Sequence, residues 1–391
     1  MKYFSAQYII TNSGTPLKRA VISTEDDGTI IQIEDTLGDL QEKHSVEFHN
    51  GIIIPGFVNC HCHLELSHMK GSVRQGSGLG GFIEQVRNTR ANNSESIIAS
   101  AKTADNDMYT EGVNLCADIC NTSFTFNIKR ESRISYINLL EVFGVDPVRA
   151  VHRMAEIIRI SEIAGAMNLA FSIVPHSVYS LSLPLFRLLR ETNKYNKVTS
   201  IHFMETAGEV TFLEKHSGPV MTSYKQSGLL PAILETVKSH VDAVLNEITP
   251  AGNLILVHNT FTDRETIRKI KVRGNLFWCL CPNSNIYIEN EIPPLNLLIE
   301  EGCNITIGTD SLASNYKLNM LEELKTLQSD FPSISIEEMV KWSTLNGAKA
   351  LGEDDKFGKI EKGKRPGLLL LQNTDLQNMR LLPESFVTRL I

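Results

Sequence analysis

The sequence lacks the long apolar segments that place a chain in a membrane or direct it out of the cell. Its most apolar stretches, such as residues 51–58 and 368–371, are far shorter than the roughly 20 residues that cross a bilayer. Residues 1–14 contain no apolar core of the roughly 7 to 15 residues that signal peptides carry. We therefore expect a cytoplasmic protein with no membrane partner.

Basic clusters and cysteines are also scarce. The net charge is −7 and there is no long run of Lys or Arg, which argues against nucleic acid or an anionic membrane as a partner, because both need a concentrated basic surface. Small molecules are the expected partners. The seven cysteines are an odd number spread thinly over 391 residues, a pattern typical of free thiols in a reducing compartment. We expect no structural disulfide.

Both ends of the chain alternate short β-like runs with turn signals. Near the N-terminus, runs at residues 8–11 and 30–33 are separated by Gly-containing turns, and near the C-terminus a turn-rich stretch leads into the apolar run 367–371. Neither end contains enough apolar residues to be stable alone. We predict one small composite β-sandwich built from residues 1–55 and 352–391.

Residues 56–351 repeat a short apolar run, a loop and a helical segment, which is typical of βα units and a parallel sheet. Eight such units in roughly 290 residues fit an α/β fold of the (β/α)8 TIM barrel type, which usually takes about 250 residues and more with insertions. The expected strands lie near residues 57–63, 113–119, 134–143, 170–175, 198–204, 253–258, 276–281 and 304–308.

Helical segments are expected at residues 148–164, 262–272 and 335–351. The interval 206–250 is too long for a single connecting helix and contains several Gly residues. We predict that part of it is a loop over the mouth of the barrel, followed by a helix near 232–247.

The chemistry of such a barrel lies at the C-terminal ends of its strands. A barrel without a catalytic or metal site would end its strands with small residues, whereas here the strand ends carry side chains that can bind a metal. They are His61, His63, Glu141, His176, His202, His258 and Asp310.

The segment His61-Cys62-His63 is the sharpest local signal. Side chains alternate along a strand, so the two histidines point the same way and Cys60 and Cys62 point to the opposite face. Two imidazoles on one face can hold one metal ion. Two alternatives stay open: the histidines are hydrogen-bonded core residues, or the thiols join them in a structural zinc site, which the alternation disfavours.

The other strand-end residues have both functional and structural interpretations. Glu205, just past His202, could shuttle protons beside a metal or be a solvated loop charge. Asp310 could bind a metal or cap the next helix, and His258 could orient a reactant or be a buried structural histidine. Because all the structural explanations would have to hold at one mouth of one barrel, we favour a site.

Together, these segments resemble the amidohydrolase superfamily in its deaminase and chlorohydrolase branch. The resemblance rests on residues 55–63, His202-x-x-Glu205, Val257-His258 and Gly308-Thr309-Asp310-Ser311, and it covers nearly the whole chain. Residues 63–67, 175–180 and 282–285 are similar to the aminodeoxyfutalosine deaminase subgroup, whose substrate is an adenine nucleoside derivative.

The resemblance implies one divalent metal held by His61, His63, His202 and Asp310. Members with two metals bridge them through a carboxylated lysine on the fourth strand, and residues 170–176 contain no lysine. Zinc is the first choice because histidine and carboxylate ligands with an open position suit catalytic zinc, although iron accepts similar ligands.

The reaction implied is hydrolytic deamination of an amino-substituted heterocycle, in which ammonia is released. In such a hydrolase of non-peptide carbon–nitrogen bonds, Asp310 would accept a proton from water, Glu205 would protonate a ring nitrogen and His258 would orient the water. The candidates for substrate recognition are His176, Glu65, Glu141 and the loop over residues 206–230.

Two other functions fit the same residues. An amide or chloro-heterocycle hydrolase would use the same metal without needing Glu205 to protonate a ring nitrogen. A non-catalytic ligand-binding relative would be expected to have lost polar residues at the barrel mouth, and all of them are in place. The sequence leaves open the exact substrate, the metal and the oligomeric state, a homodimer included.

Overall fold

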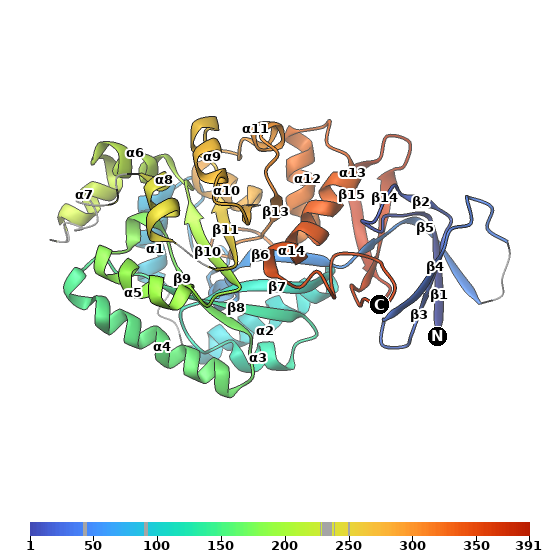
Figure 1. Ribbon diagram of the computed structural model, residues 1–391, viewed down its shortest axis with the longest axis horizontal. Helices are drawn as coiled ribbons and strands as arrows, with labels where there is room; N and C mark the ends of the chain where they lie inside the picture. Colours follow the sequence, from blue (N-terminus) through green and yellow to red (C-terminus); the bar gives the residue numbers. More distant parts are fainter. Residues whose placement is uncertain (42–44, 90–92, 227, 229–236, 238, 249–250) are drawn as a thin grey trace.

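The computed structural model describes residues 1–41, 45–89, 93–226, 228, 237, 239–248 and 251–391. It is a mixed α/β structure in which parallel strands are surrounded by helices (Figure 1). A separate sheet, to which both ends of the chain contribute, lies at one end of the molecule (Figure 1).

The parallel strands form two four-stranded sheets. The first contains, in order, β6 (Phe57–Cys62), β7 (Val113–Cys120), β8 (Ser135–Val142) and β9 (Phe171–Pro175), and the second contains β10 (Val198–Phe203), β11 (Asn253–His258), β12 (Leu276–Leu280) and β13 (Ile305–Ile307). Each strand overlaps one of the eight predicted strands. Isolated parallel bridges join Cys62 to Asp310 and Ser177 to His202, so the edges of the two sheets meet on both sides.

The eight strands are buried along almost their whole length, as expected for parallel strands that are covered on both faces, and β11 and β12 are also largely apolar. The longer helices are α1 (Gly78–Thr89), α2 (Ser94–Thr110), α4 (Ala150–Ala166), α5 (Leu183–Asn193), α6 (Ala207–Lys215), α7 (Gly218–Gln226), α9 (Arg264–Lys271), α10 (Pro282–Glu289) and α12 (Met320–Asp330). The shorter ones are η1 (Leu64–Met69), α3 (Phe126–Glu131), η2 (Pro147–Arg149), η3 (Val178–Ser180), α8 (His240–Asp242), η5 (Ala243–Glu247), α11 (Leu295–Glu300), α13 (Ile336–Lys341), η6 (Trp342–Asn346) and α14 (Gly347–Leu351).

The predicted helices at 148–164, 262–272 and 335–351 are confirmed by α4, α9 and the run from α13 to α14. The interval that we expected to contain a loop over the barrel mouth is largely helical where it is described, because Thr206 caps α6 and Gly218 opens α7. Part of the predicted helix at 232–247 lies outside the described residues; its described part contains α8 and η5.

Cys60 and Cys62 do not share a face of β6, contrary to our expectation. Cys60 packs in an apolar cluster with Val257 and Cys279, whereas Cys62 lies in the larger cluster with Met108 and other helix residues. The pairing of β6 with β7 shifts between Asn59 and Cys62, and this irregularity breaks the strict alternation of side chains.

The sheet from the two chain ends has seven strands. Its order is β15 (Arg380–Arg389), β14 (Leu368–Asp375), β5 (Val46–Pro55), β1 (Lys2–Ile9), β3 (Val21–Thr24) and β4 (Ile30–Glu34), with β2 (Leu17–Lys18) paired to β1. The two chain ends pair within this sheet, since β14 runs antiparallel to β5 with Leu371 opposite Ile52. At Gly51, where φ is 138°, a Cβ would lie 2.4 Å from the Leu371 carbonyl oxygen, so only glycine fits.

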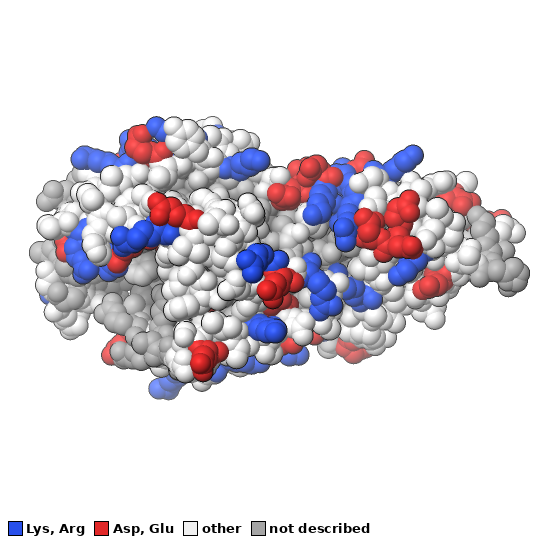
Figure 2. Space-filling view, turned by 90° about the horizontal axis from the view of Figure 1, so that it is seen from below, with Lys and Arg blue, Asp and Glu red and all other residues white. Residues whose placement is uncertain are grey.

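All seven cysteines are free, as predicted. None of the helices in the described ranges is long and apolar enough to cross a membrane. On the face shown in Figure 2, basic and acidic side chains of the described residues are interspersed rather than gathered into a patch of one sign.

Candidate metal centre

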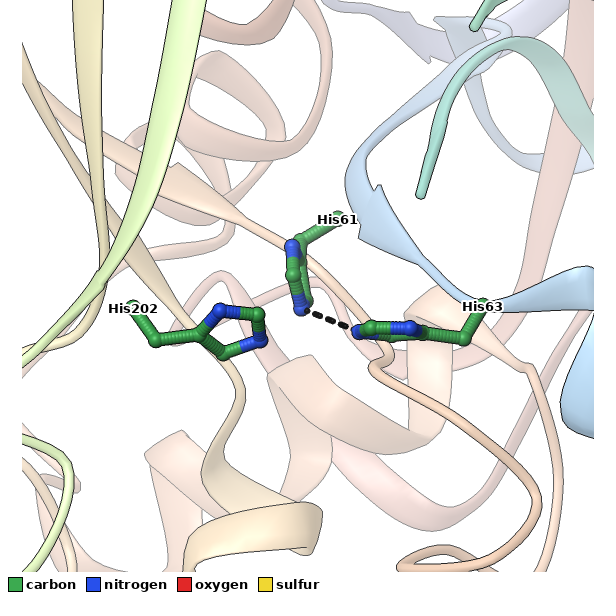
Figure 3. Close-up of side chains that lie close together, drawn as sticks. All are labelled: His61, His63 and His202. Atoms are coloured by element: carbon green, nitrogen blue, oxygen red, sulfur yellow. Dashed lines mark hydrogen bonds between the residues drawn. The ribbon is translucent and has the colours of Figure 1, made fainter. Parts of the chain in front are cut away.

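Three histidines at the C-terminal ends of two strands from different sheets point toward one another (Figure 3). His61 is on β6, His63 follows that strand and His202 is on β10; one ligand atom from each lies within 4.8 Å of the others. The Nε2 atoms of His61 and His63 are 3.1 Å apart. Asp310, just past β13, places Oδ1 3.6 Å from Nε2 of His61 and 3.4 Å from Nε2 of His63.

The protonation states of this cluster suit a divalent cation. Burial lowers the pKa of His61 to about 3 and also lowers the pKa of His63 and His202, so the imidazoles are neutral and can act as ligands. Burial alone would raise the pKa of Asp310, but the hydrogen bond with His61 and the neighbouring histidines hold it well below its usual range. Three neutral imidazoles and one carboxylate are a donor set that zinc commonly takes.

Neighbouring groups fix the orientation of two of these residues. Nδ1 of His202 donates a hydrogen bond to the His176 carbonyl oxygen at 2.8 Å, which leaves Nε2 with its lone pair. Oδ2 of Asp310 accepts hydrogen bonds from the hydroxyls of Ser284 at 2.6 Å and Ser314 at 2.5 Å, which leaves Oδ1 for the histidine cluster. Both residues are therefore held as a metal ligand would be.

Backbone strain is concentrated at the same strand ends. Asp310 has a φ of 55° and His258 a φ of 77°, in the left-handed region that residues other than glycine rarely adopt. Such conformations cost on the order of 1–3 kcal/mol each and persist where the surrounding structure enforces them, most often at functional sites.

Glu205 and His258 lie together beside the cluster. Oε1 of Glu205 is 3.6 Å from Nε2 of His258, and both side chains are buried. Burial raises the pKa of Glu205 to about 8, so at neutral pH its carboxyl group carries a proton that it can donate. Burial also lowers the pKa of His258, which keeps this imidazole neutral.

A cavity of about 780 Å³ opens over these residues. Its floor includes His63, His202, Glu205, His258 and Asp310. Such a volume is in the range of sites that enclose ligands of drug-like size. The sequence-predicted residues Glu141 and His176 also line it, and with His202 they form a second group whose ligand atoms lie within 4.8 Å.

Glu65, which we expected to contact substrate, is not among the described residues that line the cavity. Its Oε2 atom accepts hydrogen bonds from the backbone N–H of Asn121 at 3.2 Å, and from the N–H and hydroxyl of Thr122 at 3.1 and 2.8 Å. Asn121 in turn donates to the Glu141 carbonyl oxygen at 2.9 Å and does line the cavity. Glu65 thus organises the loop after β7.

Several lining residues were missed by the sequence reasoning because they lie in connecting segments. Four apolar side chains of α1 form one wall, and two arginines reach the cavity from η2 and α4. They are Leu79, Phe82, Ile83, Val86, Arg149 and Arg153. The two arginines lie four residues apart in the segment after a strand, and this spacing was the sequence signal that they share one face of a helix near the site.

A buried ion pair supports the segment that follows His63. Asp118 on β7 accepts a hydrogen bond from the backbone N–H of Leu64 at 2.7 Å and pairs with Lys129 of α3. The side chains of Asp118 and Lys129 have no exposed surface. Burial alone would lower the pKa of Lys129, but Asp118 and Cys120 raise it above its ordinary value, so the ammonium group stays charged.

Replacing Lys129 by methionine is expected to lower the free energy of unfolding by about 3–5 kcal/mol, because it leaves the Asp118 carboxylate buried without a cation. Equilibrium urea unfolding measures the change. The double variant Lys129→Met/Asp118→Asn should lose less, since it removes both charges. Lys194→Met, which breaks an exposed ion pair with Glu191, is the control and should leave the free energy of unfolding nearly unchanged. A Lys129→Met loss as small as the control would contradict the prediction.

A model of the amidohydrolase family matches residues 52–387. The chain belongs to the amidohydrolase family. Adenosine deaminase of Helicobacter pylori is 25% identical over 336 residues, which span 82% of this amidohydrolase and 79% of that protein.

Solved structures share the fold of this amidohydrolase. Aminofutalosine deaminase of Helicobacter pylori in complex with methylthio-coformycin superposes with a TM-score of 0.76 at 22% identity, over 96% of this chain and 93% of the other. Atrazine chlorohydrolase of Arthrobacter aurescens TC1 complexed with zinc gives a TM-score of 0.71 at 17% identity, over 94% and 86%.

Proposed function

We propose that this amidohydrolase deaminates an amino-substituted heterocycle by hydrolysis, and that the substrate is an adenine nucleoside derivative such as aminodeoxyfutalosine. The observation that carries the proposal is the buried Glu205 carboxyl, which holds a proton at neutral pH beside His258 and the histidine cluster. Deamination of a ring needs a proton donor for the ring nitrogen next to the attacked carbon.

We assign His61, His63, His202 and Asp310 as ligands of one divalent metal ion, with zinc as the first choice and iron as the alternative. When bound, such a cation acts as a Lewis acid and makes a water molecule acidic enough to attack near a pH of about 7. The neutral imidazoles, the ionised Asp310 and the adjoining cavity support this assignment.

The side chains divide the proton transfers among them. Asp310 accepts a proton from the attacking water, and Glu205 donates its proton to the ring nitrogen beside the attacked carbon. His258, 3.6 Å from Glu205, accepts or donates a hydrogen bond that orients the water. A proton passed on from Asp310 to the amino group lets it leave as ammonia when the carbon–nitrogen bond breaks. The proton of the added hydroxyl group returns to Glu205 as the ring carbonyl forms.

Substrate recognition is assigned to Glu141 and His176 at the cavity wall, with Glu65 acting through the loop at Asn121. The apolar wall from α1 and the exposed guanidinium of Arg149 favour a nucleoside that carries an extended substituent with an anionic end.

Replacing Arg149 by methionine tests this specificity. We expect KM for S-adenosylhomocysteine, whose substituent ends in an amino-acid group with a carboxylate, to rise about tenfold, since a charge-assisted hydrogen bond contributes about 1.5–3 kcal/mol. KM for methylthioadenosine, which has the same thioether but no carboxylate, should stay unchanged. Arg159→Met on an exposed turn of α4 is the control. Equal effects on both substrates, measured by ammonia release, would contradict an anion contact.

The two four-stranded sheets support a closed (β/α)8 barrel over residues 56–351, since bridges connect their edges on both sides. We infer that residues 1–55 and 352–391 form the composite sandwich domain and that the enzyme acts in the cytoplasm, where its free cysteines stay reduced.

An ammonia-release screen of the zinc-loaded enzyme tests the function. The panel contains adenine nucleosides, guanine, cytosine, simple amides and a chlorotriazine. Ammonia from an adenine nucleoside is the expected result. Chloride release from the triazine, or hydrolysis of amides without deamination, would overturn the proposal in favour of the alternative hydrolases on the same scaffold.

A further inference from the structure

Glu209 on α6 has a fully buried carboxylate that joins three parts of the chain. Oε2 accepts a hydrogen bond from the backbone N–H of Glu205 at 3.0 Å. Oε1 lies 2.7 Å from Nε2 of His240 on α8, and because a carboxylate only accepts, this imidazole nitrogen carries the proton. The backbone N–H of Glu209 donates to the hydroxyl of Thr206, the N-cap of α6, at 3.2 Å.

His240 is fixed from a second side. Its ring packs edge-on against Phe203, the last residue of β10, with ring centroids 5.2 Å apart and an interplanar angle of 75°. It also begins α8, where Ser239 caps the helix through the backbone N–H of Asp242. The Glu209–His240 pair therefore connects the end of the strand that carries His202 with the backbone of Glu205.

Helix capping alone does not account for this arrangement. In an ordinary Thr-x-x-Glu capping box the glutamate reaches back to the N–H of the N-cap residue itself. Here Glu209 reaches one residue further, to Glu205, and is buried against an imidazole. A buried carboxylate is costly unless all its hydrogen bonds are satisfied, so a surface glutamate would cap the helix more cheaply.

We propose that Glu209 and His240 are positioning residues, which fix the backbone of Glu205 and so hold its carboxyl group at the cavity beside Nε2 of His258. The inference rests on the role of Glu205 in the proposed function. Met204, directly before Glu205, is in the left-handed region with a φ of 47°, so the chain turns sharply there. The hydrogen bond from the N–H of Glu205 to Glu209 fixes the direction of the chain after this turn.

The test compares Glu209→Ala with Glu209→Gln in the zinc-loaded enzyme, with 5′-deoxyadenosine and methylthioadenosine as substrates. The readouts are kcat, KM and zinc per chain, at a temperature well below the Tm of each variant. We expect Glu209→Ala to lower kcat about 10- to 100-fold at unchanged KM and zinc content, because small displacements of a catalytic group reduce turnover by about this factor. Glu209→Gln should recover most of kcat, since its amide oxygen still accepts from the N–H of Glu205 and its NH2 group can donate to Nε2 of His240 when that imidazole carries its proton on Nδ1.

Two further variants separate positioning from stability. Asp263→Ala removes a cap of the same kind from α9, where Asp263 accepts from the backbone N–H of Thr266 at 2.7 Å, and should lower Tm without lowering kcat. Adding His240→Ala to Glu209→Ala should reduce kcat no further, because both changes remove the same contact.

A wild-type kcat in Glu209→Ala, measured while Glu205→Gln is inactive, would overturn the positioning role and leave the proposed function intact. Full activity of Glu205→Gln would instead overturn the proposed proton donor. If Glu209→Ala does not fold, His240→Ala decides: a lower kcat with unchanged KM supports the inference, and an unchanged kcat overturns it.

Discussion

Replacing His61 or His63 by alanine is expected to abolish metal binding and with it all turnover. Loss of a group that only hydrogen-bonds a ligand already weakens metal binding by about 10- to 100-fold, and loss of a ligand itself should exceed this. The Nε2 atoms of both residues lie within 3.6 Å of Oδ1 of Asp310, so each removal leaves the remaining donors with one position unfilled. Elemental analysis of the purified variants gives metal per chain.

His152→Ala is the matched control, since this histidine lies on the exposed face of α4 and should leave metal content and turnover unchanged. Because His61 is fully buried, its removal also creates a cavity, so circular dichroism and Tm must accompany the metal analysis. Full metal occupancy in a folded His63→Ala variant would reject the ligand assignment.

Glu205→Gln is expected to keep the metal and lose turnover. Glutamine has nearly the same shape but no acidic proton, and general acid–base catalysis contributes about 10²- to 10⁴-fold, so kcat should fall by that factor while KM changes little. The burial that raises the pKa of Glu205 to about 8 is the reason for expecting a proton donor here.

Glu214→Gln, on the exposed side of α6, is the control for Glu205→Gln and should retain the wild-type kcat. Steady-state ammonia release gives kcat and KM, and elemental analysis gives zinc per chain. An active Glu205→Gln enzyme would contradict the proton-transfer role, and a variant that had lost its metal would instead place Glu205 among the ligands.

The strand-end residues were the most predictable part of the molecule. Apolar runs mark parallel strands, and the C-terminal ends of parallel strands meet on one side, so His61, His202 and Asp310 could be expected together although long stretches of sequence separate them. The structure brings these side chains within a few ångströms of one another. The alternation within residues 60–63 was less reliable, because a register shift leaves no trace in the residue types.

Contacts made by connecting segments could not be predicted in the same way. The path of a loop depends on its neighbours. The sequence therefore placed Glu65 near the site but did not reveal that its carboxylate accepts hydrogen bonds from the backbone N–H groups of residues 121–122. The wall formed by α1 was missed for the same reason. For Glu209, the sequence did contain a signal, because Thr206-x-x-Glu209 is typical of the start of a helix. That the Glu209 side chain is buried against His240 of α8 is seen only in the structure.

The pairing of β5 with β14 has a consequence for the synthesis of the chain. Ile52, Ile53 and Ile54 form a buried apolar strand whose backbone groups on one side bond only to residues 368–371. While the ribosome is still making the catalytic region, this strand edge has no partner, and an uncovered apolar edge readily pairs with other chains. The nascent protein is therefore expected to carry an aggregation-prone edge for most of its translation.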